Sequence, residues 1–147
     1  MNKVLSALAI AVIATISGPP ARGAVVLVDF QQALNSDEIK RALGNDVVFY
    51  LSGMTTPTIQ KTFQVVGGRS TTIRGSGTPQ KNCLRVLLKV LQTLHDQARR
   101  QGGNAVVNIV SDYKNKEVAN SSTIECYTGD TVMAHVTLKG FVAVVDQ

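Results

Sequence analysis

Cysteine is scarce in this chain of 147 residues, which contains only Cys83 and Cys126. The two positions are 43 residues apart, so the sequence lacks the C-x-x-C spacing that redox-active thiol pairs use at a helix N-terminus. Thiol-exchange chemistry is therefore disfavoured. In an exported protein with just two cysteines a single structural disulfide is the natural state, and we expect the bond Cys83–Cys126.

The sequence also lacks an apolar run of the ~20 residues that a membrane-spanning helix needs. The apolar stretch from Val4 to Ile16 is shorter, follows a basic residue and ends before Pro19-Pro20, which is typical of an export signal. Cleavage after Gly23 leaves a small residue, Ala21, at the third position before the cut. The sequence therefore predicts a cleaved signal peptide at residues 1–23 and a periplasmic or secreted product that does not span a membrane.

Charge of one sign is not concentrated in any segment. The chain has 15 basic and 10 acidic residues, and removal of Lys3 and Arg22 with the signal leaves 13 basic residues and a net charge of +3. Because the basic residues are scattered, we expect no nucleic-acid partner, while attraction to an anionic envelope surface stays open. The remaining chain of about 124 residues is long enough for one ordinary domain.

No complete nucleotide-binding loop is present. The stretches Gly67-Gly68-Arg69-Ser70 and Gly75-Ser76-Gly77-Thr78 invite comparison with loops that bind phosphate. However, Lys81 lies between Gln80 and Asn82, where a Walker loop has glycine before the lysine and serine or threonine after it. We therefore expect no nucleotide, and flexible glycine-rich connections are the simpler interpretation.

Catalytic constellations are missing as well. No paired-carboxylate motif occurs, and most acidic residues fall in predicted turns or on the outer face of a helix. A triad could be drawn from Ser111, Asp112 and His135, but adjacent residues of a strand point to opposite faces, so Ser111 and Asp112 would diverge. We therefore expect no enzymatic activity, no catalytic residue and no cofactor.

The first half of the chain contains several predicted elements. Val25–Val28 is a β-prone run that could be an edge strand or a trailing segment. Asn35 and Glu38 have capping-box spacing ahead of Gly44, which predicts a helix over Ser36–Leu43. Asp46–Ser52 is continuously apolar and predicts a central strand. Two β-branched runs, Ile59–Val66 and Ser70–Ile73, flank Gly67-Gly68 and predict a hairpin, because paired glycines can supply the φ angles of a tight turn.

The longest predicted element is a helix from Pro79 to Gln101, with Thr78 as N-cap and Gly102-Gly103 at its end. An apolar face that must cover a sheet is formed by Leu84, Leu87, Leu88, Leu91, Leu94 and Ala98. The opposite side carries a charged band of Arg85, Lys89, Asp96, Arg99 and Arg100, in which Asp96 can pair with Arg100. A solvated surface is the simpler interpretation of this band, and Arg85, Lys89 and Arg100 are the candidate partner face.

Beyond the helix, strands are expected at Ala105–Val110, Ser122–Tyr127 and Val132–Val145, with a polar loop over Tyr113–Ser121 and a possible interruption of the last strand at Lys139-Gly140. The fold class is therefore α+β, with one long amphipathic helix packed on a largely antiparallel sheet and a short N-terminal helix. We expect an N-terminal extension with the short helix over residues 24–45 and a single domain over residues 46–147.

Metal binding is the main rival use of the cysteines, because His95 and His135 complete a set of four possible ligands. Cys83 and His95 lie twelve residues apart on one helix, or ~18 Å along its axis, and cannot share an ion. His95 falls on the apolar face, where we expect a structural, hydrogen-bonded histidine. His135 could approach Cys126 across the turn at Gly129 and is a weak metal candidate, so no metal site is assigned.

The segment Ala98–Ile109, with the sequence ARRQGGNAVVNI, resembles the A-x-x-x-G-A-N-A-V-V signature of small bacterial proteins. These proteins are grouped with the heavy-metal-binding superfamily that includes the Rcs-pathway outer-membrane lipoprotein. The order of Val48-Phe49-Tyr50, Cys83, Glu125-Cys126 and the run from Met133 to Gly140 looks like an exported subfamily often mislabelled as an excinuclease subunit. The resemblance covers roughly Asp46 to Gly140.

The resemblance implies an α+β fold whose helix leads through a Gly-Asn-Ala turn into a strand, and it implies no established activity. It favours the Cys83–Cys126 bond, since the lipoprotein relative has disulfides in the same general region. Gly103 replaces the usual alanine, which we expect to be harmless, and His135 stands where the subfamily usually has a small glycine. The excinuclease label has no support in the residues, because the nucleotide loop is missing.

These observations together favour a non-enzymatic binding or interaction module of the cell envelope. Its partner would be an envelope protein or an anionic envelope surface. The alternative is a metal-binding or metal-responsive periplasmic protein that uses His135 and neighbouring carboxylates.

Overall fold

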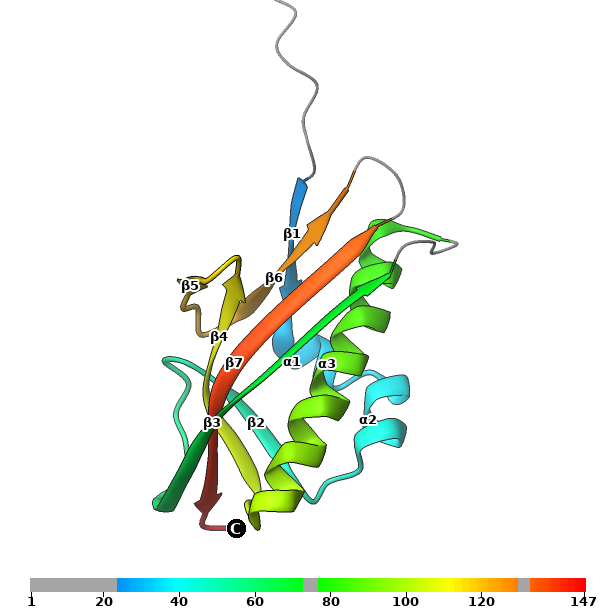
Figure 1. Cartoon of the computed structure of the whole chain (residues 1–147). Coiled ribbons are helices and arrows are strands. Elements are labelled where there is room, and N and C mark those ends of the chain that lie inside the picture. The colour runs from blue at the N-terminus through cyan, green and yellow to red at the C-terminus, as the bar shows by residue number, and fades with distance from the viewer. Residues whose placement is uncertain (1–23, 73–76, 130–132) are drawn as a thin grey trace, which may run out of the picture.

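A computed structural model describes residues 24–72, 77–129 and 133–147 (Figure 1). The predicted signal peptide, residues 1–23, lies outside these ranges. Within them the elements follow in the order β1 (Ala24–Asp29), α1 (Phe30–Leu34), α2 (Asp37–Leu43), β2 (Val48–Leu51), β3 (Ile59–Thr72), α3 (Pro79–Gln101), β4 (Ala105–Tyr113), β5 (Lys116–Val118), β6 (Thr123–Thr128) and β7 (Ala134–Val145).

The helix α3 has the predicted bounds. The Thr78 side chain accepts a hydrogen bond from the Lys81 N–H at 3.3 Å, and Gly102 ends the helix with a left-handed φ of 80°. Its buried residues are Asn82, Cys83, Val86, Leu87, Val90, Leu91, Leu94 and Ala98. Leu84 and Leu88 are only partly buried, so the covered face is turned toward Val86 and Val90 relative to the predicted one.

The strands form one mixed, curled sheet centred on β7 (Figure 1). β3 pairs with one edge of β7, while β6 and then β4 pair with the other edge, all in antiparallel orientation. β1 extends the sheet beyond β6, β5 pairs with the end of β4, and β2 runs parallel to β4. The predicted α+β fold with a largely antiparallel sheet is therefore confirmed.

The prediction of a central strand over Asp46–Ser52 is wrong. Only Val48–Leu51 is extended, and it pairs with β4 alone at the end of the strand order. Phe49 and Leu51 are buried in the main core, whereas Tyr50 packs on a small apolar cluster on the other face. Only Phe49 and Leu51 are buried, whereas Val48 is 41% exposed and Tyr50 is half-buried, so the continuous apolar run does not mark a strand covered on both faces.

The predicted hairpin around Gly67-Gly68 is also wrong, because both glycines lie inside the continuous strand β3. A Cβ atom at position 68 would lie 3.2 Å from both Cγ1 and the carbonyl oxygen of Val90 on α3. Glycine is therefore required here by the close approach of the helix to the strand, and not by a turn.

The N-terminal segment departs from the prediction in detail. Of the two alternatives for Val25–Val28, the edge strand is observed, and it leads into α1, which the sequence did not indicate. Phe30 of α1 is fully buried in the main core. The next helix begins at Asp37 with Ser36, not Asn35, as its N-cap, since Ser36 Oγ accepts the Ile39 N–H at 3.4 Å.

The C-terminal half matches the prediction more closely. The expected polar loop over Tyr113–Ser121 contains β5, and β7 continues without interruption through Gly140. Gly103, expected to be a harmless replacement for alanine, is required in this structure, since a Cβ atom there would overlap Cγ1 of Val142 and lie 2.9 Å from the carbonyl oxygen of Ala143. The turn after α3 therefore passes too close to β7 for a side chain.

The main core lies between the three helices and one face of the sheet, because the buried residues of α1, α2 and α3 all belong to one apolar cluster. We call the opposite face of the sheet the open face, since the described part of the chain places no helix on it. It carries the alternate β7 side chains of His135, Thr137, Lys139 and Phe141, together with Thr71, Arg69 and Val65 at the paired positions of β3.

Candidate functional site

The two cysteines meet where α3 crosses the sheet. Cys83 lies in the first turns of α3 and Cys126 in β6, and their Cα atoms are 5.9 Å apart. The sulfurs are 2.10 Å apart, at disulfide distance, and both residues are fully buried in the main core. The pair therefore ties the long helix to the sheet and leaves no free thiol among the described residues.

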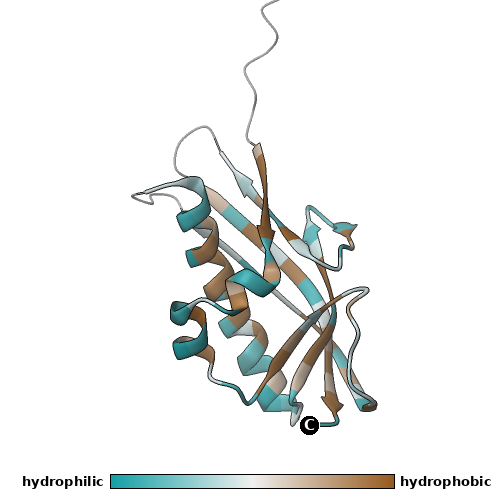
Figure 2. Cartoon of the chain, turned by 180° about the vertical axis from the view of Figure 1, so that it is seen from behind, coloured by the Kyte–Doolittle hydropathy of each residue, from teal (hydrophilic) through white to brown (hydrophobic). Residues whose placement is uncertain are grey.

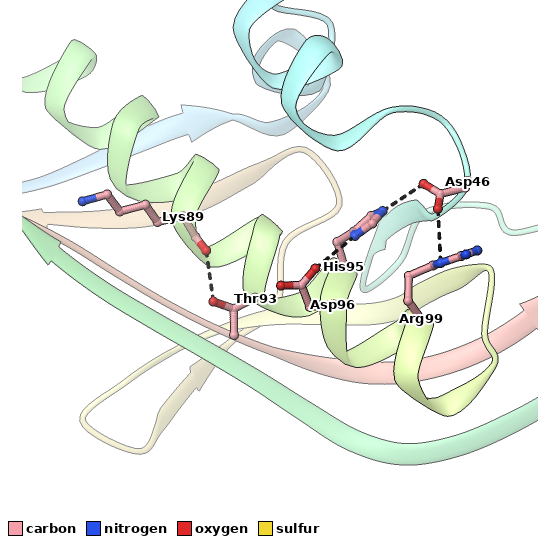
Figure 3. Close-up of polar contacts among 6 residues, drawn as sticks. All are labelled: Asp46, Lys89, Thr93, His95, Asp96 and Arg99. Atoms are coloured by element: carbon pink, nitrogen blue, oxygen red, sulfur yellow. Dashed lines mark hydrogen bonds and ion pairs between the residues drawn. The ribbon is translucent and has the colours of Figure 1, made fainter.

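The predicted partner face is exposed but dispersed. Arg85, Lys89 and Arg100 follow one side of α3, and fifteen residues, or ~22 Å of helix, separate the first from the last. The expected pair between Asp96 and Arg100 is not formed among the described residues, because Asp96 lies 3.5 Å from His95 Nδ1 instead (Figure 3). The three cations do not converge on one point.

A polar contact on α3 joins the helix to the loop before β2 (Figure 3). His95 Nε2 lies 2.8 Å from Asp46 Oδ1, and Arg99 Nε lies 3.3 Å from Asp46 Oδ2. The hydrogen bond with His95 is the largest cause that holds the pKa of Asp46 below its ordinary value of 3.8, against a smaller opposing effect of desolvation. His95 is thus hydrogen-bonded as predicted, in a contact that stabilises the fold.

The open face carries a second group of polar side chains, which we call the aromatic cluster: Tyr113, Tyr127 and His135. The rings of Tyr113 and Tyr127 are stacked with centroids 3.7 Å apart, and His135 meets Tyr113 edge-on at 5.3 Å. The Tyr127 hydroxyl donates a hydrogen bond to Glu125 Oε2 at 2.7 Å, which, with burial, raises the pKa of Tyr127 to about 12. Tyr127 therefore stays protonated at neutral pH.

His135 is held between two threonines of the open face. Its Nδ1 contacts the Thr71 hydroxyl, and its Nε2 lies 2.8 Å from the hydroxyl of Thr137. Burial, and to a lesser degree the positive charge of Arg69, lowers the pKa of His135. The ring is therefore neutral at physiological pH, and a metal ion could bind it only by displacing a threonine.

The expected approach of His135 to Cys126 does not occur. Tyr127, and not Cys126, is the β6 residue that pairs with His135, and Cys126 points to the opposite face of the sheet. Among the residues that the structure describes, no group of three histidine, cysteine or acidic side chains lies close enough to hold a metal ion.

The open face is apolar around Phe141 of β7, and a cavity opens there. The cavity, of about 440 Å³, lies between the loop after β2 and strands β3, β4 and β7. Its walls are formed by Leu51, Met54, Ile59, Val107 and Phe141, and its polar lining by Thr56, Thr62 and Asn108. Asn108 has a left-handed φ of 54°, where the register between β4 and β7 shifts, so a bulge in β4 shapes this cavity.

Sequence reasoning did not find the aromatic cluster or the cavity. Alternation along the last strand places His135, Lys139 and Phe141 on one face, and this signal was available. The positions of Tyr113 and Tyr127 depend on the register of three strands, which one sequence does not reveal. The bulge at Asn108 leaves no clear mark in the local sequence.

Comparison with known proteins leaves the family open. No family model and no curated protein matches the chain. Among solved structures, one match is a protein of unknown function from Pediococcus pentosaceus that is assigned to the DUF74 family. It is 17% identical, covers 68% of this chain and 96% of its own, and superimposes with a TM-score of 0.40. In the described residues, no helix combines the length and apolar character needed to cross a bilayer.

Proposed function

We propose that this protein is a non-enzymatic binding module of the bacterial cell envelope, and that its open face receives an apolar side chain of a partner protein. The observation that carries this proposal is Phe141, which is 38% exposed on the uncovered face of the sheet and borders the apolar cavity. Exposed apolar side chains around a hollow are characteristic of binding surfaces, because their burial against a partner is favourable.

The apolar surface extends beyond the cavity. Val65, which is 51% exposed, pairs with Phe141, and Ile59, which is 42% exposed, pairs with Val145, so all three exposed side chains share the open face. Beneath them, Ala105, Val107, Ala143 and Val145 form a small buried cluster. The patch is therefore supported by rigid strands and not by a loop alone.

The extent of this patch favours a protein partner over a small ligand. A cavity of about 440 Å³ could hold one large side chain or a small ligand. A ligand that filled the cavity would still leave Val65 exposed, since Val65 is not part of its lining. A protein surface can cover both, and the hydroxyls of Thr56 and Thr62 could bind polar groups at the rim.

Location in the envelope rests on the export signal expected at residues 1–23 and on the cysteine pair. Disulfides persist in oxidising compartments and are rare in the cytoplasm, so the geometry of Cys83 and Cys126 supports this part of the proposal. Metal binding through His135 has no comparable support, because threonine hydroxyls lie within hydrogen-bond distance of both ring nitrogens.

Photo-crosslinking in intact cells tests the proposal. A benzophenone amino acid at position 141 should capture a defined envelope protein, and the adduct should weaken when Val65→Ser is added. The same probe at Gln92, which is exposed on α3, is the matched control and should give no such adduct. Absence of any protein adduct from position 141 would remove the basis of the proposed function.

A further inference from the structure

The first strand of the sheet leaves one edge without a partner. β1 pairs with β6 through six consecutive residues without a register shift, and no described strand pairs with its other side. Ala24 to Val28 contain no charged side chain, no proline and no glycine. Leu27 is 62% exposed and Val25 is 48% exposed, and Figure 2 shows the strand as predominantly hydrophobic.

The other edges are protected in ways that β1 is not. β3 carries Lys61 and Arg69, its register with β7 shifts twice, and the side chain of Gln101 accepts the Gln64 N–H at 3.2 Å. β2 has four residues, and β5 has three and carries Lys116 and Glu117. Short length, charge and bulges are the usual means by which proteins keep sheet edges from pairing. Among the described edge strands, β1 alone has five consecutive residues, Ala24 to Val28, with no charged side chain and no register shift.

A groove accompanies the open edge on the side of the helices. It has a volume of about 430 Å³, and its apolar lining comes from Val26, Leu27 and Val28 of β1, Ala33 of α1 and Leu84 of α3. A strand added beside β1 would direct every second side chain into this groove and would place the others on the open face. The edge can therefore pair with an extended segment in which every second residue is apolar.

We infer that the occupant of this edge is β1 of a second copy of the same chain, so that two molecules share one continuous antiparallel sheet. β1 itself meets the requirement, because Val26 and Val28 point toward the helices and Val25 and Leu27 point to the open face. A two-fold axis perpendicular to the sheet keeps the two faces of both copies aligned. Such an interface is self-complementary and closes after two chains, because it uses the same edge of each.

The faces restrict the register to steps of two residues, and the axis at Val26 is the one that pairs Ala24 to Val28 entirely with one another. With the two-fold axis at Val26, Val25 of one copy lies opposite Leu27 of the other, and both pairs of exposed side chains are brought together on the open face. A shift by one residue would place the apolar side chains of one copy on the wrong face. This register also leaves Asp29 outside the paired region, where its carboxylate accepts the Gln32 N–H at 2.9 Å and caps α1.

Sedimentation analysis of the full chain, exported to a bacterial periplasm and purified from it, tests this inference over a concentration series from micromolar to hundreds of micromolar. We expect the mass of two chains. Leu27→Lys should give the mass of one chain with an unchanged far-ultraviolet circular dichroism spectrum, because the residue is already largely exposed and its substitution leaves the fold intact. Val65→Lys, on the edge strand β3, is the matched control and should remain a dimer.

A second measurement tests the register. When Val25→Cys and Leu27→Cys chains are mixed in equal amounts and oxidised, crosslinked heterodimers should exceed each crosslinked homodimer by well over the two-fold ratio that random pairing gives. A wild-type chain that stays monomeric at every concentration, a Leu27→Lys variant that remains dimeric, or crosslinking without this preference would overturn the inference. The proposed partner site is distinguishable, because Leu27→Lys should leave the adduct from position 141 intact.

Discussion

The carboxylate of Asp46 and the imidazole of His95 are 49 residues apart in the chain and meet at 2.8 Å (Figure 3). The contact joins the loop that precedes β2 to the C-terminal half of α3, where the His95 side chain is 19% exposed. Arg99, one turn further along the helix, contacts the second oxygen of the same carboxylate. One short acidic side chain thus fixes the end of the sheet against the longest helix.

We expect Asp46→Asn to lower the stability of the fold more at about pH 5.5 than at about pH 3. The pKa of Asp46 is lowered in the folded state, so its stabilising effect is present above the ordinary value of 3.8 and is lost as the pH falls through the folded value. The side chain is 43% exposed, and solvent screening keeps the effect small. Urea midpoints at the two pH values measure it. Asp96→Asn is the control, and an equal loss from Asp46→Asn at both pH values would contradict the prediction.

The neighbouring glycines of β3 should respond differently to alanine. At position 68 the new Cβ atom would lie 3.2 Å from Val90 of α3, and we expect a loss of about 1–3 kcal/mol from this overpacking. At position 67 its nearest contact is the carbonyl oxygen of Leu138 at 3.5 Å, an ordinary distance, so Gly67→Ala should be neutral or slightly stabilising. Chemical denaturation of both variants compares them, and equal effects would count against this packing.

Removal of the disulfide by the double substitution Cys83→Ser and Cys126→Ser should cost about 4 kcal/mol of unfolding free energy, because the bond closes a long loop in the unfolded chain. The sequence separation of 43 residues sets that loop. Denaturation of the wild type with and without reductant provides the control, since reductant should destabilise the wild type and leave the double variant unchanged. A wild-type mass that shows two free thiols would contradict the bond.

Glu125→Gln should lower the pKa of Tyr127 from about 12 toward the usual value, because the hydrogen bond to the Glu125 carboxylate is the main cause of the raised pKa. The chain has three tyrosines, and an ultraviolet absorbance titration should resolve a late step, in which the tyrosine with the highest pKa ionises. Tyr127→Phe should abolish this late step, whereas Tyr113→Phe should preserve it. A late step that survives Tyr127→Phe would show that another tyrosine is responsible.

Local signals predicted the long helix well. Thr78, Pro79 and Gly102 act through contacts within one helical turn, and such contacts can be read directly from the sequence. Gly67-Gly68 misled the prediction because the same residue pair suits a turn or a close helix–strand contact, and only the position of α3 decides between them.

The candidate binding surface could be predicted only in part. Alternation along β7 places Phe141 and His135 on one face, but whether a helix covers that face depends on the packing of the whole chain. The cavity depends on the bulge at Asn108 and on the loop after β2, which meet only in three dimensions. The charged band on α3 was visible in the sequence, whereas the apolar face opposite the helix was not.

The most direct test of the proposed function is the ratio of crosslinked partner obtained with one photo-reactive probe at two positions in intact cells. Position 141 reports on the open face, and position 89 reports on the charged band of α3. We predict a defined protein adduct from position 141 and much less from position 89. A partner captured from position 89 and not from position 141 would contradict the account and would assign the interaction to Arg85, Lys89 and Arg100.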